Sequence, residues 1–225
     1  MNRKIITTED GSTTIHLEEW NEQYHSTHGA IQEAMHVYLQ TGLHHLQNTF
    51  NPDQIHILEI GFGTGLNAFI TYLEAQKNKL DTTYHGVEAY PVASAEITQL
   101  NYISELNAED EKEVFDKMHV CEWGKETILS ENFKLLKRQQ FFDQIEDKEK
   151  FNLIYFDAFG AHVQPELWTV SIFQKMYTAL QNESVLVTYS AKGSVRRAMQ
   201  EVGFKVERLP GPPGKREMLR ATKNN

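Results

Sequence analysis

The 225-residue sequence lacks several features that would assign it to other classes of protein. Cys121 is its only cysteine, which excludes an intrachain disulfide and a metal site of the CxxC type. No stretch contains the roughly 18 apolar residues that a membrane-spanning helix needs, and residues 1–14 contain no apolar core of a signal peptide. We therefore expect a cytoplasmic protein that does not enter a membrane.

Positive charge is also scarce in the chain as a whole. The formal net charge of −9 argues against a broad nucleic-acid surface, because phosphate binding relies on clustered lysine and arginine. The carboxyl-terminal part is the exception, and its basic residues are Lys192, Arg196, Arg197, Lys205, Arg208, Lys215, Arg216, Arg220 and Lys223. These residues could form a local basic face or an ordinary solvated surface, and the sequence leaves both open.

The most informative stretch that is present is a glycine-rich turn within Ile55–Asn67, IHILEIGFGTGLN. Its apolar first half predicts a short buried strand. Gly61, Gly63 and Gly65 allow positive φ and let a ligand approach the backbone closely. The helix expected to begin near Gly65 offers unpaired N–H groups and the positive end of a dipole.

Spacing and charge at this turn favour one cofactor over another. A dinucleotide-binding turn has the spacing G-x-G-x-x-G, whereas the third glycine here comes one position early. Glu59, just before the turn, would repel a pyrophosphate but could pair with an ammonium group. S-adenosyl-L-methionine carries an ammonium and a sulfonium and no phosphate, so it is favoured over NAD. The residues predicted to contact it here are Glu59, Gly61, Phe62, Gly63, Gly65 and Asn67. A turn that binds no ligand remains the alternative.

Strands and helices are expected to alternate along most of the chain, which predicts a doubly wound α/β fold with a mostly parallel sheet. The expected strands are Ile55–Ile60, Thr83–Glu88, Met118–Glu122, Phe151–Asp157 and Ser184–Ser190, followed by a hairpin of Phe204–Leu209 and Met218–Ala221. The expected helices are Leu66–Ala75, Pro91–Leu106, Phe133–Phe142, Leu167–Leu180 and Gly193–Val202. We expect one domain, residues 1–225, on which residues 1–50 pack as an amino-terminal hairpin (Ile5–Glu18) and helix (Ala30–Gly42).

Four consecutive expected strands end in an acid: Glu59, Glu88, Glu122 and Asp157. In an open α/β sheet, ligands bind beyond the carboxyl ends of the strands, where these side chains would meet. Glu88, with Ala89, is placed to bind ribose hydroxyls, although Glu88 could instead cap the next helix. Glu122 and Trp123 would flank the adenine, although Trp123 could equally be a core residue.

Asp157 is the best catalytic candidate. Methyl transfer from a sulfonium is an in-line displacement, and an amine acceptor must be neutral to attack. A carboxylate at the mouth of the sheet could hold the amine and take the proton that leaves. Capping of the following turn is the alternative role for this residue.

The histidine-rich segment before the first long helix is predicted to face the substrate. Tyr24, His25 and Ser26 would lie over the glycine turn, together with Phe159 from the loop after Asp157. A His-x-x-His pair without a CxxC partner is more often structural or substrate-facing than a metal ligand. We therefore expect no metal.

Five motifs together resemble the methyltransferase domain of MnmC, over about Asp10 to Ala221. They are GFGTGLN (Gly61–Asn67), YFDAF (Tyr155–Phe159), PELWT (Pro165–Thr169), TYSAKGSVRRAMQEVGF (Thr188–Phe204) and GPPGKREMLRA (Gly211–Ala221). The resemblance implies a class I, Rossmann-like fold that uses S-adenosyl-L-methionine. It also implies that the 5-aminomethyl group of (2-thio)uridine at the wobble position of tRNA is methylated.

The resemblance also implies roles for individual residues. Glu59, the three glycines and Glu88 would contact the cofactor, and Asp157 would lie beside the substrate amine. A phosphate-facing patch would be formed by Lys192, Arg196, Arg197, Lys215 and Arg216. Bifunctional members of the family carry a FAD-dependent oxidoreductase domain that has no counterpart here, so we expect a stand-alone form. The alternatives are a methyltransferase of a small amine or another nucleic acid, and a non-catalytic binding module with this fold.

Overall fold

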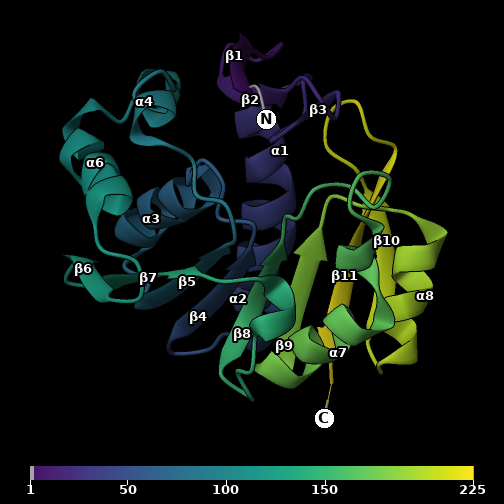
Figure 1. The fold of residues 1–225 in the computed structure, drawn as a ribbon. Helices are drawn as coiled ribbons and strands as arrows, with labels where there is room; N and C mark the ends of the chain where they lie inside the picture. The colour runs from purple at the N-terminus through teal and green to yellow at the C-terminus, as the bar shows by residue number, and fades with distance from the viewer. Residues whose placement is uncertain (1–2, 225) are drawn as a thin grey trace.

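The computed structural model describes residues 3–224, which contain an eight-stranded sheet with helices on both faces (Figure 1). The strand order is β10-β11-β9-β8-β4-β5-β7-β6. The parallel strands are β4 (Ile55–Ile60), β5 (Thr82–Glu88), β7 (Phe133–Gln139), β8 (Phe151–Phe156) and β9 (Leu180–Thr188). Antiparallel pairing adds β6 (Glu126–Ser130) at one edge, and β10 (Lys205–Pro210) and β11 (Glu217–Lys223) at the other. The predicted doubly wound fold with a late hairpin is confirmed.

The central strands are buried on both faces. Ile57 and Tyr155 belong to the core beneath α3 (Leu66–Asn78), whereas Ile154 belongs to the core beneath α7 (Val170–Ala179) and α8 (Gly193–Glu201). Successive side chains of a strand point to opposite faces, so a strand covered on both sides is apolar throughout, as Phe151–Phe156 is. Within residues 3–224, none of these or the other helices is long and apolar enough to cross a membrane.

The amino-terminal segment forms a small separate sheet and one long helical run. The small sheet consists of β1 (Arg3–Thr7), β2 (Thr13–Leu17) and β3 (Glu22–Gln23). The helical run comprises α1 (Ala30–Ala34), a π-helical stretch (Met35–His44) and α2 (His45–Phe50). It packs on the large sheet, where a Cβ on Gly42 would lie 3.0 Å from the Val187 side chain. The expected hairpin and helix are present, and the helix extends beyond its expected end at Gly42.

The strand expected at Met118–Glu122 is wrong. Residues Lys112–Val120 form the helix α6 instead, with Phe115 and Met118 buried on one side. The spacing of three residues between them is typical of a helical face packed on the core. The ring of Phe115 packs against that of Phe69 in α3, with centroids 5.0 Å apart.

The helix expected at Phe133–Phe142 is also wrong, because Phe133–Gln139 forms strand β7. Its buried residues alternate, but the third of them is Lys137, which interrupts the apolar pattern. The Lys137 ammonium is accommodated because it donates to the His119 carbonyl at 2.7 Å and lies 4.8 Å from the centre of the Trp123 ring. A buried charge paired in this way cannot be recognised from the local sequence.

The long helix expected from Pro91 to Leu106 is replaced by two short ones, α4 (Ser94–Ile97) and α5 (Tyr102–Glu105). Asn101 lies between them and holds the amino-terminal hairpin. Its side chain accepts from the Thr13 N–H at 2.8 Å and donates to the Gly11 carbonyl at 2.9 Å. These contacts with a distant segment interrupt the helix.

Candidate active site

A cavity of about 1180 Å³ opens at the carboxyl ends of the parallel strands. It lies where the direction of strand order reverses, between β4 and β8, which is the expected ligand position in such a sheet. Residues that follow five strands line it: Gly61 and Gly63 after β4, Ala89 after β5, Phe142 after β7, Asp157 after β8 and Tyr189 after β9. The cavity exceeds the usual size of a single small-molecule site, so it can hold a cofactor and part of an acceptor.

The glycine turn holds the loops of two neighbouring strands together. The N–H groups of Gly61 and Phe62 both donate to the Val87 carbonyl at 3.0 Å. Gly61 has φ +91°, and a Cβ there would lie 2.6 Å from the carbonyl oxygen of Asp157. Only glycine fits this position. Phe62 also lines the cavity, and its largely buried ring packs against Gly86.

Two of the predicted acids are linked beneath the cavity by one amide. The Asn67 Nδ2 donates to Glu59 Oε1 at 2.9 Å and to Asp157 Oδ2 at 2.8 Å. Glu59 is fully buried and does not line the cavity, whereas Asn67 and Asp157 do. The remaining oxygens, Glu59 Oε2 and Asn67 Oδ1, have no hydrogen-bond partner. The predicted attraction of Glu59 for an ammonium group would therefore act through Asn67.

Glu88, the last residue of β5, contacts the glycine turn from the neighbouring strand. Its carboxylate accepts from the Gly63 N–H at 3.1 Å and from the Tyr90 N–H at 2.9 Å. It caps no helix, because α4 begins only at Ser94. Glu88 and Ala89 both line the cavity, and the carboxylate retains acceptor capacity for ligand hydroxyls.

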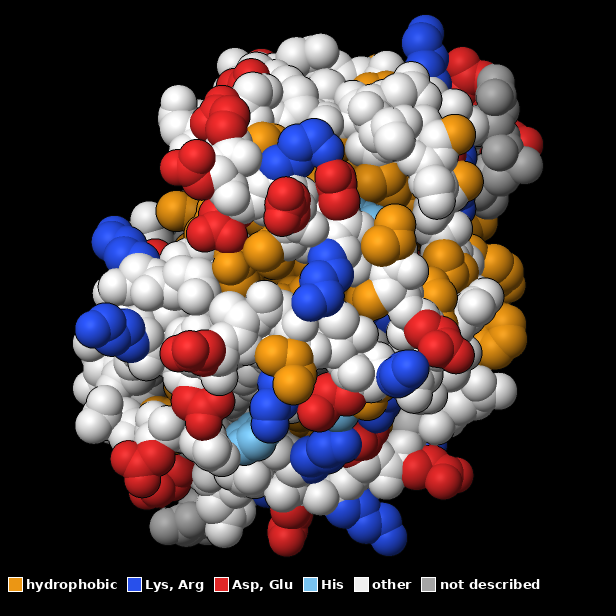
Figure 2. All heavy atoms as spheres, turned by 90° about the vertical axis from the view of Figure 1, so that its left-hand side faces the viewer, with side chains coloured by type: hydrophobic (Ala, Val, Ile, Leu, Met, Phe, Trp, Pro, Cys, Tyr) orange, Lys and Arg blue, Asp and Glu red, His pale blue; other side chains and the backbone are white. Residues whose placement is uncertain are grey.

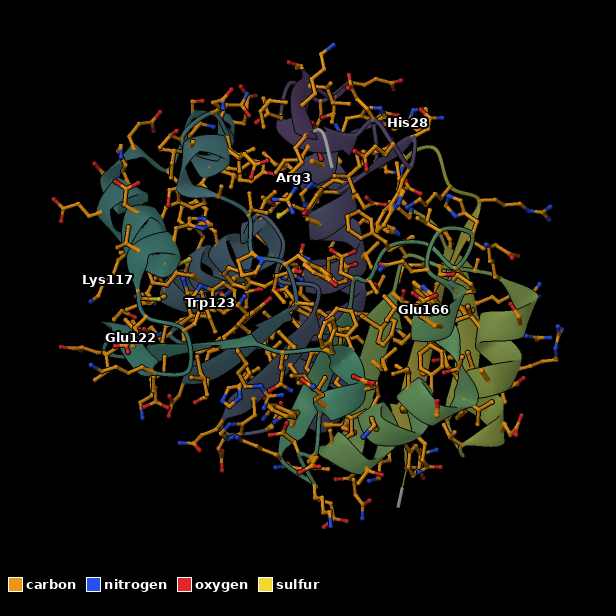
Figure 3. The ribbon with its side chains drawn as sticks, viewed as in Figure 1. Arg3, His28, Lys117, Glu122, Trp123 and Glu166 are labelled. Carbon is orange, nitrogen blue, oxygen red and sulfur yellow. The ribbon has the colours of Figure 1, made fainter. Side chains whose placement is uncertain are left out.

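The structure does not place Glu122 and Trp123 at the cavity, where they were expected to flank the adenine. The Glu122 side chain is 74% exposed, pairs with Lys125 and lies at the outer edge of the molecule beside β6 (Figure 3). Trp123 packs edge-on against Phe62, beneath the turn. Neither residue lines the cavity. The error follows from the misplaced strand, since the loop after the true strand β7 brings other residues to this position.

Phe142 and Asp143 are the residues that the sequence analysis missed here. Both line the cavity, with the Phe142 ring buried and the Asp143 side chain exposed. We expect Asp143→Ala to weaken binding of S-adenosyl-L-methionine by about three- to tenfold, the value of one hydrogen bond to the adenine amine. The matched control Glu122→Ala removes an equally exposed acid away from the cavity and should leave the affinity unchanged. Calorimetric titration of both variants checks this, and equal affinities would contradict it.

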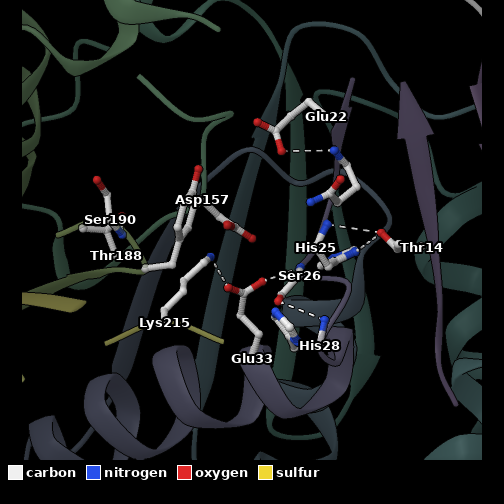
Figure 4. Close-up of polar contacts among 12 residues, drawn as sticks. Thr14, Glu22, His25, Ser26, His28, Glu33, Asp157, Thr188, Ser190 and Lys215 are labelled. Atoms are coloured by element: carbon white, nitrogen blue, oxygen red, sulfur yellow. Dashed lines mark hydrogen bonds and ion pairs between the residues drawn. The ribbon is translucent and has the colours of Figure 1, made fainter. Parts of the chain in front are cut away.

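The predicted substrate-facing residues of the amino-terminal segment do reach the cavity. Tyr24, His25, Ser26 and Phe159 all line it, and the rings of Tyr24 and Phe159 meet edge-on with centroids 5.0 Å apart. His25 lies between two threonine hydroxyls. One is Thr14 at 2.9 Å (Figure 4), and the other is Thr64 on the glycine turn at 3.4 Å. Burial lowers the pKa of His25 to about 4, so the ring is neutral at pH 7. Its contacts attach the amino-terminal sheet to the glycine turn.

The histidines of this segment are not arranged as a set of metal ligands in the part of the chain that the structure describes. Among residues 3–224, no three or more histidine, cysteine, aspartate or glutamate side chains are grouped as a metal site. His28 forms an exposed pair with Glu9 instead.

The basic residues of the predicted phosphate patch divide into two groups. Lys192 and Lys215 line the cavity, whereas Arg196, Arg197 and Arg216 lie outside it. Arg197 and Arg216 are exposed. The opposite side of the molecule, over α4, α6 and β6, carries interspersed acidic and basic side chains (Figure 2). Arg197 lies in α8, on a side of the molecule that Figure 2 does not show.

Asp157 is electrostatically unusual. Burial raises the pKa of its carboxyl to about 7, and the negative charge of Glu33 acts in the same direction. The nearby Tyr38 hydroxyl, the hydrogen bond from Asn67 and the positive charge of Lys215 oppose this rise in pKa. A carboxyl group with a pKa near the pH of the cell can accept a proton during a reaction and release it afterwards.

Glu33 and Tyr189 are further cavity residues that the sequence analysis missed. Glu33 had one usable signal, since it is an acid among the buried residues Ala30, Ala34 and Val37 on the apolar side of its helix. Tyr189 also had a signal, because it directly follows the apolar strand β9, but the expected strand ran to Ser190 and included it.

The residues present fit the predicted cofactor. Cationic groups are favoured by acids beside and beneath the cavity, and the unpartnered Asn67 Oδ1 is a free acceptor for an ammonium. The glycine at position 63 lets the Tyr24 ring pack against the turn, since a Cβ there would lie 3.1 Å from that ring. The glycine turn presents no lysine or arginine that would hold a pyrophosphate, in keeping with S-adenosyl-L-methionine rather than a dinucleotide.

Comparison with known proteins agrees with this arrangement. Residues 129–224 match a family model described as S-adenosyl-L-methionine-dependent methyltransferase. The chain is 28% identical over 224 residues to the tRNA 5-methylaminomethyl-2-thiouridine biosynthesis bifunctional protein MnmC of Leptospira interrogans, with 96% of this chain and 34% of that protein covered. It therefore spans about a third of the length of this relative.

Solved structures show the same fold. MNMC2 from Aquifex aeolicus superimposes with a TM-score of 0.76 at 24% identity, covering 98% of this chain and 70% of that one. Spermidine synthase from Thermotoga maritima has a TM-score of 0.57 at 14% identity, covering 99% and 69%. The prediction from the sequence is therefore confirmed: the chain is an S-adenosyl-L-methionine-dependent methyltransferase of class I fold, similar to the methyltransferase domain of MnmC.

Proposed function

We propose that this enzyme methylates the amino nitrogen of a 5-aminomethyl group on (2-thio)uridine at the wobble position of tRNA. The observation that carries the proposal is the similarity to MnmC along 96% of the chain, together with a name that assigns MnmC to tRNA 5-methylaminomethyl-2-thiouridine biosynthesis. The cavity supports it, because Asp157 lines it next to the glycine turn at the carboxyl ends of the strands. Since tRNA is processed in the cytoplasm, the protein would act there.

The proposed cofactor contacts follow from the positions of the side chains. Gly61 and Gly63 let the ligand approach the backbone, and Glu88 accepts hydrogen bonds from ribose hydroxyls. Asn67, supported from below by Glu59, accepts from the ammonium group. Phe142 and Asp143 take the place expected of the adenine contacts. When bound, S-adenosyl-L-methionine supplies a methyl group on a sulfonium sulfur.

Asp157 prepares the acceptor amine. Its ionised carboxylate, held by Asn67, accepts a hydrogen bond from the amine and orients the nitrogen lone pair toward the methyl carbon. A methyl donor held by Gly61, Gly63, Glu88 and Asn67 would supply the carbon to which the nitrogen bonds, and the electron pair of the broken carbon–sulfur bond would remain on sulfur. The nitrogen then carries one proton too many, which passes to the Asp157 carboxylate, whose pKa of about 7 allows it to accept.

We expect disruption of the gene to remove the methylaminomethyl nucleoside from tRNA and to leave the aminomethyl form in its place. Mass spectrometry of tRNA nucleosides measures both. Complementation with the wild-type gene should restore methylation, as should Glu122→Gln, whereas Asp157→Asn should not. An unchanged nucleoside profile would reject the proposal, and full restoration by Asp157→Asn would favour a non-catalytic binding module.

Salt dependence separates tRNA from a small amine as the acceptor. Phosphate contacts make tRNA affinity fall steeply with salt, with a slope that grows with the number of phosphates neutralised. Binding of a small amine would show little such slope. Substitution of the exposed Arg197 in α8 by alanine should reduce the slope of log affinity against log salt concentration by about one, if the α8 side of the molecule holds tRNA.

A further inference from the structure

The Lys215 ammonium is bound inside the cavity by groups suited to a primary ammonium ion. It forms an ion pair with Glu33 and lies 3.9 Å from the centre of the Tyr189 ring. Figure 4 shows this pair directly below Asp157. A carboxylate on one side and an aromatic face on the other are strong and complementary partners for a cation of this kind.

Glu33 is held in place independently of Lys215. It projects from α1, its side chain is only 8% exposed, and its second oxygen accepts from the Ser26 N–H at 2.7 Å. A carboxylate this buried is costly to leave without a cation. Whenever Lys215 leaves, another cation is therefore favoured in its place.

Lys215 is positioned by a surface loop. The loop connects β10 and β11 across residues 211–216, in which Pro213, Gly214 and Arg216 are exposed. A lysine side chain has four rotatable bonds, so its ammonium can move out toward solvent while the backbone stays in place. In that position it could meet an anionic partner at the mouth of the cavity.

We infer that Glu33, Asp157 and the Tyr189 ring form the binding site for the acceptor's primary amino group, which binds as an ammonium ion and releases one proton to solvent before it attacks, and that Lys215 fills this site until the acceptor displaces it. The inference rests on the proposed function for its identification of the acceptor as an aminomethyl nucleoside. It adds Glu33 as a residue that selects amines, and it assigns to Lys215 the role of a stand-in cation. The alternative is a permanent ion pair that only anchors the loop to α1.

The test uses acceptors without a phosphate, so that any contact of Lys215 with tRNA phosphates does not contribute. The probes are 5-aminomethyluridine, its amine-free counterpart 5-methyluridine, and ethylamine, each titrated calorimetrically at pH 7. Lys215→Met keeps the unbranched side chain, one atom shorter, and removes its charge. We expect this variant to bind 5-aminomethyluridine and ethylamine about tenfold more tightly than the wild type, with no gain for 5-methyluridine. The double variant Lys215→Met, Glu33→Gln should lose the gain.

A second measurement on the wild-type enzyme does not depend on how well the variants fold. The NMR signal of the Lys215 Cε, assigned by its absence in Lys215→Arg, should shift when 5-aminomethyluridine or ethylamine is added and should not respond to 5-methyluridine. An unmoved signal, or a well-folded Lys215→Met with no gain for either amine, would overturn the inference. A gain for ethylamine without preference for the aminomethyl nucleoside would keep the ammonium site and reject the proposed substrate.

Discussion

Replacing Asp157 by asparagine is expected to lower the rate of methyl transfer by about 10²- to 10⁴-fold, the usual contribution of a positioned acid or base. The amide oxygen can still accept a hydrogen bond from Asn67, which now donates at 2.8 Å, so the glycine turn and the cavity should persist. Binding of S-adenosyl-L-methionine should therefore change by less than about tenfold. Single-turnover kinetics and calorimetry on the same preparation separate the two quantities.

The pH dependence of stability provides a control for this variant. Because burial raises the pKa of Asp157 from 3.8 to about 7, the folded protein binds this proton more tightly than the unfolded chain. The resulting stabilisation is complete below pH 3.8 and is lost as the pH rises through about 7. Asp157→Asn removes this dependence, so at pH 8 it should be at least as stable as the wild type in thermal unfolding. A variant that loses activity together with its fold would not support the assigned role.

Replacing Gly61 by alanine is expected to be the most damaging change in the cofactor site. The new Cβ would lie 2.6 Å from the Asp157 carbonyl oxygen, and the backbone has φ +91°, which side chains disfavour. The turn must move away from the loop after β8, so we expect affinity for S-adenosyl-L-methionine to fall by about 100-fold. The free energy of unfolding should fall by about 1–3 kcal/mol, the cost of such backbone strain.

Gly124→Ala is the matched control for this substitution. Gly124 has a similar φ of +80°, but a Cβ there would meet nothing within 4 Å, and the residue lies away from the cavity. The control therefore has the backbone strain without the clash. Calorimetry should show wild-type affinity for Gly124→Ala. Equal losses of affinity in both variants would mean that strain alone, rather than the contact between the two loops, explains the effect.

The two sides of the cofactor site differ in how well they could be predicted. The side formed by the glycine turn, Glu88 and Asp157 was placed correctly at the cavity, because each residue follows an apolar strand that is recognisable from its own sequence. The adenine side was misplaced, because Lys137 occupies a buried position in β7. A charged residue in an alternating pattern conceals a strand, so the sequence points to the acid after a wrongly assigned strand, whereas the structure brings Asp143 to the cavity.

The sequence by itself determined the class of fold and the cofactor and placed Asp157 at the rim of the sheet, because strand ends and glycine turns are local patterns that parallel sheets bring to one edge. Only the tertiary structure decided that Glu59 lies beneath the cavity and acts through Asn67. It alone paired Glu33 with Lys215, which are separated by 182 residues and belong to a helix and a distant loop. Contacts of this kind depend on how the chain closes around the sheet, which no local spacing of residues specifies.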